Sequence, residues 1–355
     1  MDTKLQNLLD FNKEQLDDIV KEMGQPKFRS GQLWDWLYKG ASFDEMTNLP
    51  ESFRKALKEK YLPGKQEIRA KLCSAIDGTV KYLFNLGDGN IVESVLMKYK
   101  YGYSACVSTQ VGCKMGCTFC ASTKAGFVRN LTSGEILGQI VSMNADMQIR
   151  IGHVVLMGIG EPLDNYENVL DFLKKAQSEN GLGISYRNIS LSTCGLAEKV
   201  IELSKEKLPI TLSVSLHSPF DEQRSEMMPV NRKYPLDKLL DACNIYTLST
   251  GRRITYEYAL IEGVNDKKEH ADRLITLLKG KLCHINLIPV NKVEGTGYKK
   301  ASAQNIAAFR QMLEKGGVNA TVRRTLGQDI EAACGQLRRA AINSGGNENE
   351  SLCHK

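Results

Sequence analysis

Short runs of apolar and β-branched residues recur along the chain from about residue 103, and a stretch with helical spacing of its apolar positions follows most of them. The β-type runs are 104–109, 153–157, 187–192, 210–216, 252–260 and 283–289. The stretches with helical spacing include 135–147, 166–177, 236–248, 267–278 and 303–315. This pattern predicts six strands that alternate with helices.

Strands that alternate with helices form a parallel sheet through right-handed crossovers. Six strands are too few for a complete eight-stranded barrel. The pattern therefore predicts an α/β fold, either an open, partial barrel or a doubly wound sheet. In both architectures the active site lies at the carboxyl ends of the strands.

The first 65 residues lack this alternation and are typical of a small helical domain. Leu9 and Leu16 lie near helical spacing, and both tryptophans, Trp34 and Trp36, belong to a compact apolar cluster. We expect an accessory domain here. Its basic residues suggest RNA docking as a further role, although a basic face is more often only solvated: Lys27, Arg29, Lys39, Arg54 and Lys55.

Residues 66–98 have the pattern of a β-hairpin. TVKYLFNL and IVESVLMKY are rich in strand-forming residues, and Gly87-Asp88-Gly89-Asn90 between them is a strong turn signal. We expect this hairpin to link the helical domain to a core domain over residues 99–330. The Gly-, Asn- and Ser-rich residues 341–355 predict a disordered tail.

Composition narrows the possible functions. The chain has 355 residues, of which 42% are hydrophobic and 25% charged, with a net charge of +6. These values exclude a largely disordered or fibrous protein and permit an RNA partner without requiring one.

No stretch approaches the ~18 consecutive apolar residues of a membrane span, and the start lacks the pattern of a signal peptide. We expect a cytoplasmic protein with no membrane association, in which the ten cysteines serve as ligands, catalysts or core residues.

Polar and glycine-rich residues follow one predicted strand after another. Because the carboxyl ends of parallel strands meet at one edge, these residues are expected to converge on a single site. The segments are Cys113 to Cys120, Gly158-Ile159-Gly160-Glu161-Pro162, Ser192-Thr193, Ser215-Leu216-His217-Ser218 and Pro289-Val290-Asn291.

The most specific of these segments is the C-x3-C-x2-C array of Cys113, Cys117 and Cys120. Three thiolates within eight residues can bind one face of a 4Fe-4S cluster, which leaves the fourth iron open for a further ligand. A zinc site with three cysteines and one histidine is the alternative. No histidine lies nearby in the sequence, which favours the cluster.

This array, with Phe119 before its last cysteine, resembles the signature of the radical S-adenosylmethionine (SAM) superfamily. The resemblance implies a partial (βα)6 barrel, SAM on the open iron, and reductive cleavage of SAM to a 5′-deoxyadenosyl radical. Gly160 and Glu161 look like the superfamily's Gly-Glu motif, which contacts the SAM amino group.

A second resemblance narrows the family. Ala332-Ala333-Cys334-Gly335-Gln336-Leu337, which follows Arg323-Arg324-Thr325-Leu326-Gly327, is similar to the C-terminal motif of the RlmN/Cfr family of RNA adenine methyltransferases. Further matches are 107–112, Ser215-Leu216-His217 and 285–289, so the similarity extends from about residue 20 to about residue 340.

The family resemblance implies a protein thiol as methyl carrier. Cys334, on a catalytic loop over 331–340, would take a methyl group from one SAM, and a second SAM would supply the radical that activates it. Cys106 would then resolve the RNA–enzyme adduct through a transient disulfide with Cys334, so its thiol is expected to be accessible. Glu93 is a candidate proton acceptor for the adenine, and Cys106 competes for that role.

The same resemblance places bound SAM beside several strand ends. Hydroxyl and amide groups suit its ribose and adenine edges. Besides Gly160 and Glu161, the implied SAM contacts are Ser192, Ser215, Leu216, His217 and Asn291.

The implied reaction is methylation of carbon 2 of adenine in 23S rRNA, in the peptidyl-transferase region, and in tRNA, 3′ of the anticodon. The segment 328–334 matches the RlmN form of the motif. The Cfr form methylates carbon 8 of the same rRNA base, and residues 97–100 are similar to those of Cfr.

The sequence also leaves open two other functions: a zinc-containing RNA-binding protein, or a radical SAM enzyme with a small-molecule substrate. The target base must be unstacked. We expect a monomer with an external electron donor such as flavodoxin.

Overall fold

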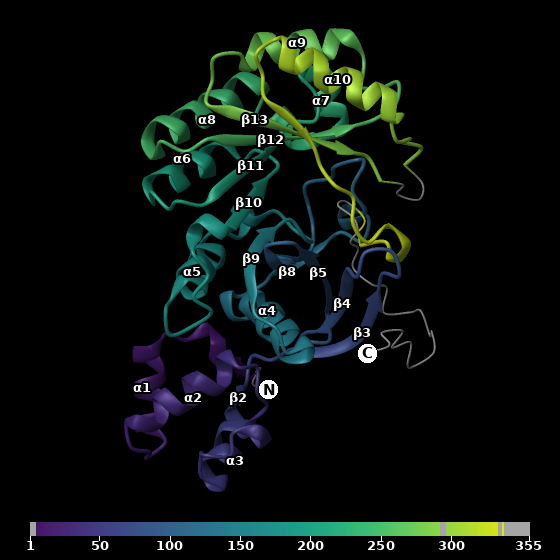
Figure 1. Ribbon diagram of the computed structural model, residues 1–355. Helices are drawn as coiled ribbons and strands as arrows, with labels where there is room; N and C mark the ends of the chain where they lie inside the picture. The colour runs from purple at the N-terminus through teal and green to yellow at the C-terminus, as the bar shows by residue number, and fades with distance from the viewer. Residues whose placement is uncertain (1–4, 292–295, 333–335, 337–355) are drawn as a thin grey trace.

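Ten strands form one sheet in the computed structural model, which describes residues 5–291, 296–332 and 336. The strand order is β14-β13-β12-β11-β10-β9-β6-β5-β4-β3, and the sheet curves into a partial barrel (Figure 1). The parallel strands are β6 (Gly102–Cys106), β9 (Ile151–Leu156), β10 (Ile189–Thr193), β11 (Thr211–Ser215), β12 (Ile254–Leu260), β13 (Cys283–Pro289) and β14 (Ala320–Val322).

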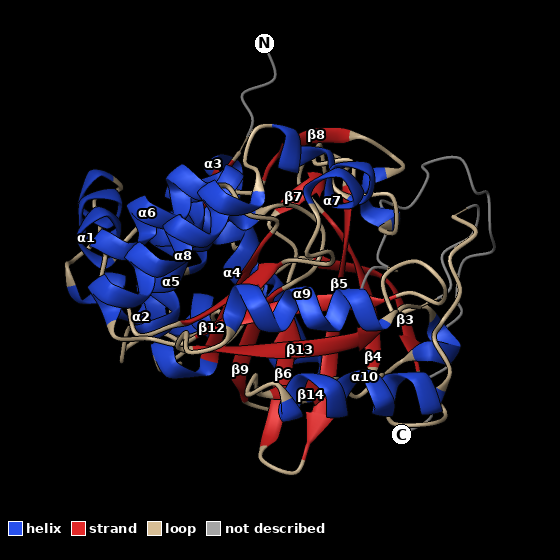
Figure 2. Ribbon diagram, turned by 90° about the horizontal axis from the view of Figure 1, so that it is seen from above, coloured by secondary structure: helices blue, strands red, loops and turns tan. Residues whose placement is uncertain are grey.

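Helices cover the outer face of the parallel strands, while the other face lines the barrel interior (Figure 2). Two of these helices begin at side-chain caps: Ser302 caps α10, and in α4 Thr132 and Glu135 form a reciprocal capping box. The helices of the core are α4 (Ser133–Met147), α5 (Tyr166–Gln177), α6 (Ala197–Lys205), α7 (Asp221–Met227), α8 (Leu236–Thr250), α9 (Lys268–Leu278) and α10 (Ala303–Lys315).

The partial-barrel prediction is confirmed, and the six expected strands and five expected helices all form. The first strand ends earlier than expected, at Cys106. The Val107 amide makes the last bond to β9, at the carbonyl of Val155, and Thr109 then bonds to the carbonyl of Ile159, beyond the end of β9. The sequence pattern missed β14, which has three residues of which two are exposed, and the helices α6 and α7.

The expected hairpin forms from β4 (Val80–Asn85) and β5 (Ile91–Tyr99), and β3 (Glu67–Cys73) adds a third antiparallel strand. It is not a separate linker between domains. Because β5 pairs with β6, with Val95 opposite Cys106, these three strands extend the barrel sheet itself.

The N-terminal unit is helical, as expected, and consists of α1 (Lys13–Glu22), α2 (Phe28–Tyr38) and α3 (Glu51–Lys60) with a short parallel pair, β1 (Gln6–Asn7) and β2 (Tyr61–Leu62). It packs on the core, where the Asp10 carboxylate accepts a 2.7 Å hydrogen bond from the amide of Gly134 at the start of α4. The indole of Trp34 donates to the carbonyl of Asn180. Both units therefore share one apolar core.

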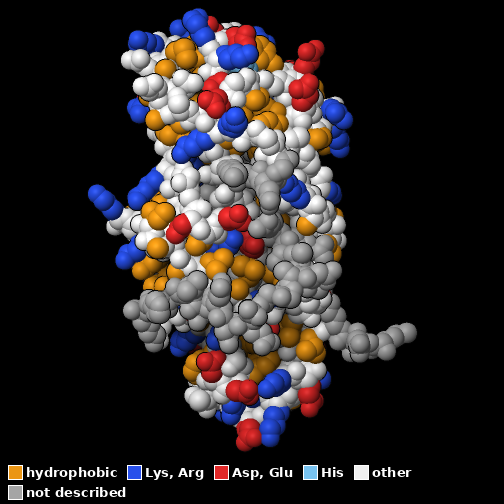
Figure 3. Space-filling view, turned by 90° about the vertical axis from the view of Figure 1, so that its right-hand side faces the viewer, with side chains coloured by type: hydrophobic (Ala, Val, Ile, Leu, Met, Phe, Trp, Pro, Cys, Tyr) orange, Lys and Arg blue, Asp and Glu red, His pale blue; other side chains and the backbone are white. Residues whose placement is uncertain are grey.

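Salt bridges already occupy part of the basic surface expected on this unit. Lys27 lies 3.4 Å from Asp17, and Lys55 lies 2.7 Å from Glu51. On the face drawn in Figure 3, acidic and basic side chains likewise alternate.

Within the described part of the chain, the structure contains no helix with the length and hydrophobicity that a bilayer crossing needs.

Candidate active site

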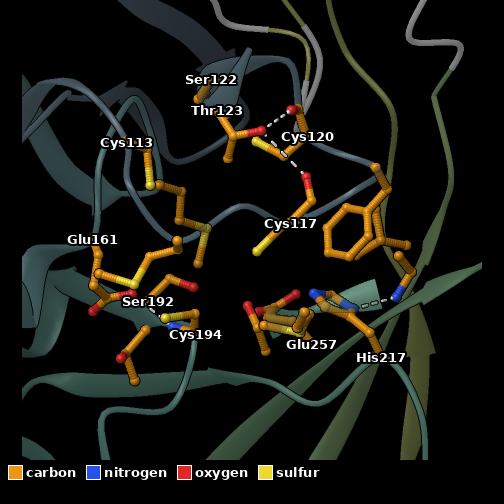
Figure 4. Close-up of a pocket in the computed structure, with 18 of the residues that line it drawn as sticks. Cys113, Cys117, Cys120, Ser122, Thr123, Glu161, Ser192, Cys194, His217 and Glu257 are labelled. Atoms are coloured by element: carbon orange, nitrogen blue, oxygen red, sulfur yellow. Dashed lines mark hydrogen bonds between the residues drawn. The ribbon is translucent and has the colours of Figure 1, made fainter. Parts of the chain in front are cut away.

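The strand ends meet at one cavity, as the sequence predicted (Figure 4). Three cysteines approach it from the loop above, and polar residues line it from the strand ends below. Of the predicted cofactor and metal residues, the structure brings together Cys113, Cys117, Cys120, Gly160, Glu161, Ser192, Ser215, His217 and Asn291.

The cysteine loop is held at its base by a small antiparallel pair, β7 (Gln110–Gly112) and β8 (Phe127–Asn130). At Gly112 the chain has φ +76°, and a Cβ there would lie 1.7 Å from the carbonyl oxygen of Gly126, so only glycine fits. Within the loop, the Thr123 hydroxyl donates to the carbonyls of Cys117 and Cys120 at 3.3 and 3.0 Å. The loop is therefore shaped before any ligand binds.

The three thiols fit a cluster better than a single ion. Burial raises the pKa of Cys113 to about 12 and that of Cys117 well above its usual value, and the neighbouring thiols add to both shifts. Thiolates here need positive charge, which iron would supply. A cubane binds each cysteine at its own iron, and cysteine thiolates are its usual ligands.

Gly160 and Glu161 form a rigid corner after β9. Gly160 has φ +110°, and a Cβ there would lie 2.7 Å from Cβ of Gln110. The buried Glu161 carboxylate accepts hydrogen bonds from the amides of Leu163 (3.0 Å) and Cys194 (2.7 Å). Burial raises the pKa of Glu161, although these bonds oppose that shift.

His217 points a defined nitrogen at the cavity. Its Nδ1 accepts a 2.8 Å hydrogen bond from the amide of Ala259, so the ring proton is on Nε2, which is available as a donor. Burial, with a smaller contribution from Arg224, lowers the pKa of His217 to about 3, which keeps the ring neutral. The residue also has a left-handed backbone, φ +56°, which is rare outside glycine and concentrates at functional sites.

Leu216 differs from its neighbours. Its side chain is fully buried in the main core and does not line the cavity. Its backbone takes part instead: its carbonyl accepts a 3.0 Å hydrogen bond from Nε of Arg224. The side chain of Leu216 therefore does not reach this cavity, in which SAM is expected to bind.

Cys106 lies in a second cavity beside the first. Its side chain is only 9% exposed, so the thiol is not accessible from the protein surface. It is accessible only from this internal cavity, which it lines. Four residues line both cavities: Met157, Ile288, Asn291 and Arg323. The second cavity is completed by Val95, Met97, Tyr99, Cys106, Arg324, Thr325, Leu326 and Ala332.

Glu93 is buried, at 4% exposure, and does not lie on a solvated strand face. It is on β5, two residues from Val95, and β5 pairs without a bulge. Because side chains alternate along a strand, Glu93 shares the face of Val95, which lines the Cys106 cavity. Cys334 lies outside the described residues, but Ala332, two positions earlier, lines that same cavity.

Two lining residues were not expected. Glu257 on β12 is buried, accepts a 2.8 Å hydrogen bond from Asn286, and lines the first cavity. Its signal was a charge inside the apolar run 254–260. Arg323, which the sequence presents only as part of the motif before Cys334, is half-buried and lines both cavities.

Comparison with known proteins agrees with this geometry. A model of the radical SAM superfamily matches residues 107–275, and one of the ribosomal RNA large subunit methyltransferase N-terminal domain matches residues 6–62. A probable dual-specificity RNA methyltransferase RlmN from Clostridium novyi (strain NT) is 51% identical over 340 residues, 95% of this chain and 99% of that protein. The chain belongs to the RlmN family.

Other relatives support the same assignment. The protein of that name from Alkaliphilus oremlandii (strain OhILAs) is 53% identical over 94% of this chain and 97% of its own length. The crystal structure of a radical SAM methyltransferase from Sphaerobacter thermophilus is 39% identical and superimposes with a TM-score of 0.90, covering 94% of this chain and 99% of that one. Membership of the RlmN family confirms the resemblance drawn from the sequence motifs.

Replacing Gly160 by alanine should strain this corner. The left-handed backbone and the buried Gln110 side chain, which bonds Asn130, Asp164 and Glu161, leave no room for a Cβ. We expect Gly160→Ala to lower the free energy of unfolding by roughly 1–3 kcal/mol, measured by urea titration. Gly152→Ala, where a Cβ meets nothing within 4 Å, is the control. Equal stability of the two variants would contradict the prediction.

His217 should make stability depend on pH. Its folded pKa of about 3 lies below the ordinary value of about 6.5. The unfolded chain therefore binds more protons between these values, and stability falls as the pH falls through this window. From pH 7 to pH 5, wild type should lose about 2 kcal/mol more than His217→Asn, whose amide oxygen can replace Nδ1. Parallel pH dependences of the two unfolding free energies would rule this out.

Proposed function

We propose that this chain methylates carbon 2 of adenine in RNA, with SAM as both the methyl donor and the source of the radical. Family membership supports the reaction class. The observation that carries the proposal is the shared wall between the cysteine-loop cavity and the Cys106 cavity. Because four residues line both cavities, a radical formed in the first would arise next to a methyl carrier in the second.

The first cavity would hold the 4Fe-4S cluster on Cys113, Cys117 and Cys120, with SAM beside it. When bound, the cluster supplies the electron that splits SAM into methionine and a 5′-deoxyadenosyl radical. The neutral His217 would donate from Nε2 to the nucleoside part of SAM, and Ser192, Ser215 and Asn291 offer further hydrogen bonds. Two SAM molecules would be used per turnover.

The second cavity would hold the carrier chemistry. Carbon 2 of adenine lies between two ring nitrogens and is electron-poor, so it cannot displace the methyl group of SAM as a nucleophile. Cys334 would carry the methyl group and lose one of its hydrogen atoms to the 5′-deoxyadenosyl radical, so that its carbon could bond to carbon 2. The adduct would then give up the ring proton and one electron, which the oxidised cluster could take back. The thiolate of Cys106 would attack the sulfur of Cys334, so that an S–S bond forms as the C–S bond to the RNA breaks and the released carbon takes up a proton.

Glu93 would accept the proton that leaves the adenine ring. Its burial on the face that lines the Cys106 cavity supports this role, because a proton acceptor must lie within reach of the ring. Cys106, which lines the same cavity, is the competing acceptor.

The substrates would be 23S rRNA and tRNA, each with its target adenine flipped out of the stack, because the Cys106 cavity lies inside the barrel. We propose that the chain acts as a monomer in the cytoplasm and receives its electrons from an external donor such as flavodoxin. Methylation at carbon 8 is the competing outcome.

Anaerobic reconstitution tests the proposal. The chain should bind about four irons and four sulfides, cleave SAM when reduced, and yield 2-methyladenosine in nuclease digests of rRNA and tRNA, detected by mass spectrometry. Cys117→Ser should abolish all three, whereas Cys243→Ser, buried in α8 away from both cavities, should keep them. A colourless zinc-containing protein, or 8-methyladenosine as product, would overturn the proposal.

The role of Glu93 has its own test. Glu93→Gln keeps the shape of the side chain and removes the base, so Cys334 should still become S-methylated. Release of methylated RNA should fall roughly 10²–10⁴-fold, with covalent RNA–enzyme adduct accumulating on denaturing gels. Wild-type turnover by this variant would remove Glu93 from the mechanism and leave Cys106 as the acceptor.

A further inference from the structure

The turn between β3 and β4 binds the segment that leads to Cys334. This segment follows β14 and crosses from the α10 side of the sheet to the β3–β4 side (Figure 1). The described part of it contains no strand after Val322, and only the single 3-10 turn Gln328–Ile330. Its position therefore depends on what it contacts.

Three hydrogen bonds join the two elements, which lie about 250 residues apart in the chain. The carboxylate of Asp329 accepts from the Ser74 hydroxyl at 2.7 Å and from the amide of Ala75 at 3.0 Å. The carboxylate of Asp77 accepts from the amide of Gly327 at 2.9 Å. Hydrogen bonds to a charged acceptor are stronger than neutral ones. We call these three bonds the clasp.

The turn is shaped for this contact. The Ser74 hydroxyl also accepts from the amides of Ile76 and Asp77, each at 3.2 Å, and Asp77 accepts from the amide of Thr79 at 3.0 Å. The Ser74 and Asp77 side chains thus fix the turn and hold the segment with the same polar groups.

The fit continues beyond the clasp towards Cys334. Gly327 has φ +63°, and a Cβ there would lie 2.8 Å from Cβ of Ala332 and 3.0 Å from Cγ2 of Thr79. The ammonium group of Lys81, a residue only 6% exposed, lies 3.5 Å from the carbonyl oxygen of Glu331. The path is therefore defined as far as Ala332, two residues before Cys334.

We propose that the clasp positions the methyl carrier, and that Ser74, Asp77 and Asp329 are positioning residues for Cys334. The inference rests on the proposed role of Cys334. A carrier must reach the SAM methyl group, the radical and the target base in turn, and an error of about 1 Å in such a position can cost 10²-fold in rate. The β3–β4 extension of the barrel would then exist to hold this segment.

Asp329→Ala removes two of the three bonds of the clasp. In the reconstituted full chain, S-methylation of Cys334 without RNA, followed by peptide mass spectrometry, should slow roughly 10- to 100-fold. Reductive cleavage of SAM should change less than twofold, because Asp329 lines neither cavity. Ser74→Ala should have a smaller effect of the same kind. The effects of the two changes should not multiply in the double variant, since they share one bond.

Two exposed neighbours supply matched controls. Gln328→Ala changes the segment and Ile76→Ala changes the turn, without touching the side chains of the clasp. Both should methylate Cys334 at the wild-type rate. Wild-type methylation in Asp329→Ala, or equal losses in the controls, would overturn the proposal.

Amide hydrogen exchange separates this proposal from the proposed function. The Gly327 amide should be protected in the wild-type chain and exchange at least 10-fold faster in Asp77→Ala, while the Glu161 and Cys194 amides stay unchanged. If wild type never methylates Cys334, the proposed function fails. If exchange at Gly327 is equally fast with and without Asp77, the clasp fails whatever the reaction is.

Discussion

Parallel hydrogen bonding from β9 to β13 places five strand ends side by side, and the cofactor cavity exists only because of this register. Ser192 pairs with Ser213, and Ser215 pairs with Glu257, so residues from distant parts of the chain reach the same level of the barrel. A shift by one residue would turn each lining side chain to the outer, helix-covered face. The chemistry of the site is therefore determined first by the backbone ladder and only then by the identity of the residues that line it.

Buried polar groups hold the loops that follow these strand ends. Arg224, fully buried, donates to the carbonyls of Cys194, Ser215 and Leu216 and to the side chain of Asn231. Like Glu161, it uses its hydrogen-bonding capacity on neighbouring loops. Because buried polar groups are costly unless satisfied, such a network favours one loop arrangement over others. Hydrogen bonds within the protein thus fix the loops of the site, which suits a reaction that must direct a radical to one carbon atom.

The sequence predicted the repeating elements and the strand-end residues well, because each depends on local pattern. Six strands, their helices and nine lining residues follow from periodicity and motif position. The failures have physical reasons. β14 is too short to leave a pattern. The hairpin's place in the sheet depends on the β5–β6 pairing, a contact that no local pattern encodes.

The sheet does not close on itself, and this openness has a use. β14 and β3 are the two edges, and a closed barrel would join them. Instead, the segment after β14 reaches the β3–β4 turn through side-chain and amide hydrogen bonds. Unpaired edges invite unwanted pairing, and a covering segment is one way in which proteins prevent it. A strand in that gap would have been fixed along its whole length by ladder hydrogen bonds, whereas the described segment is held at a few points by side chains of the turn.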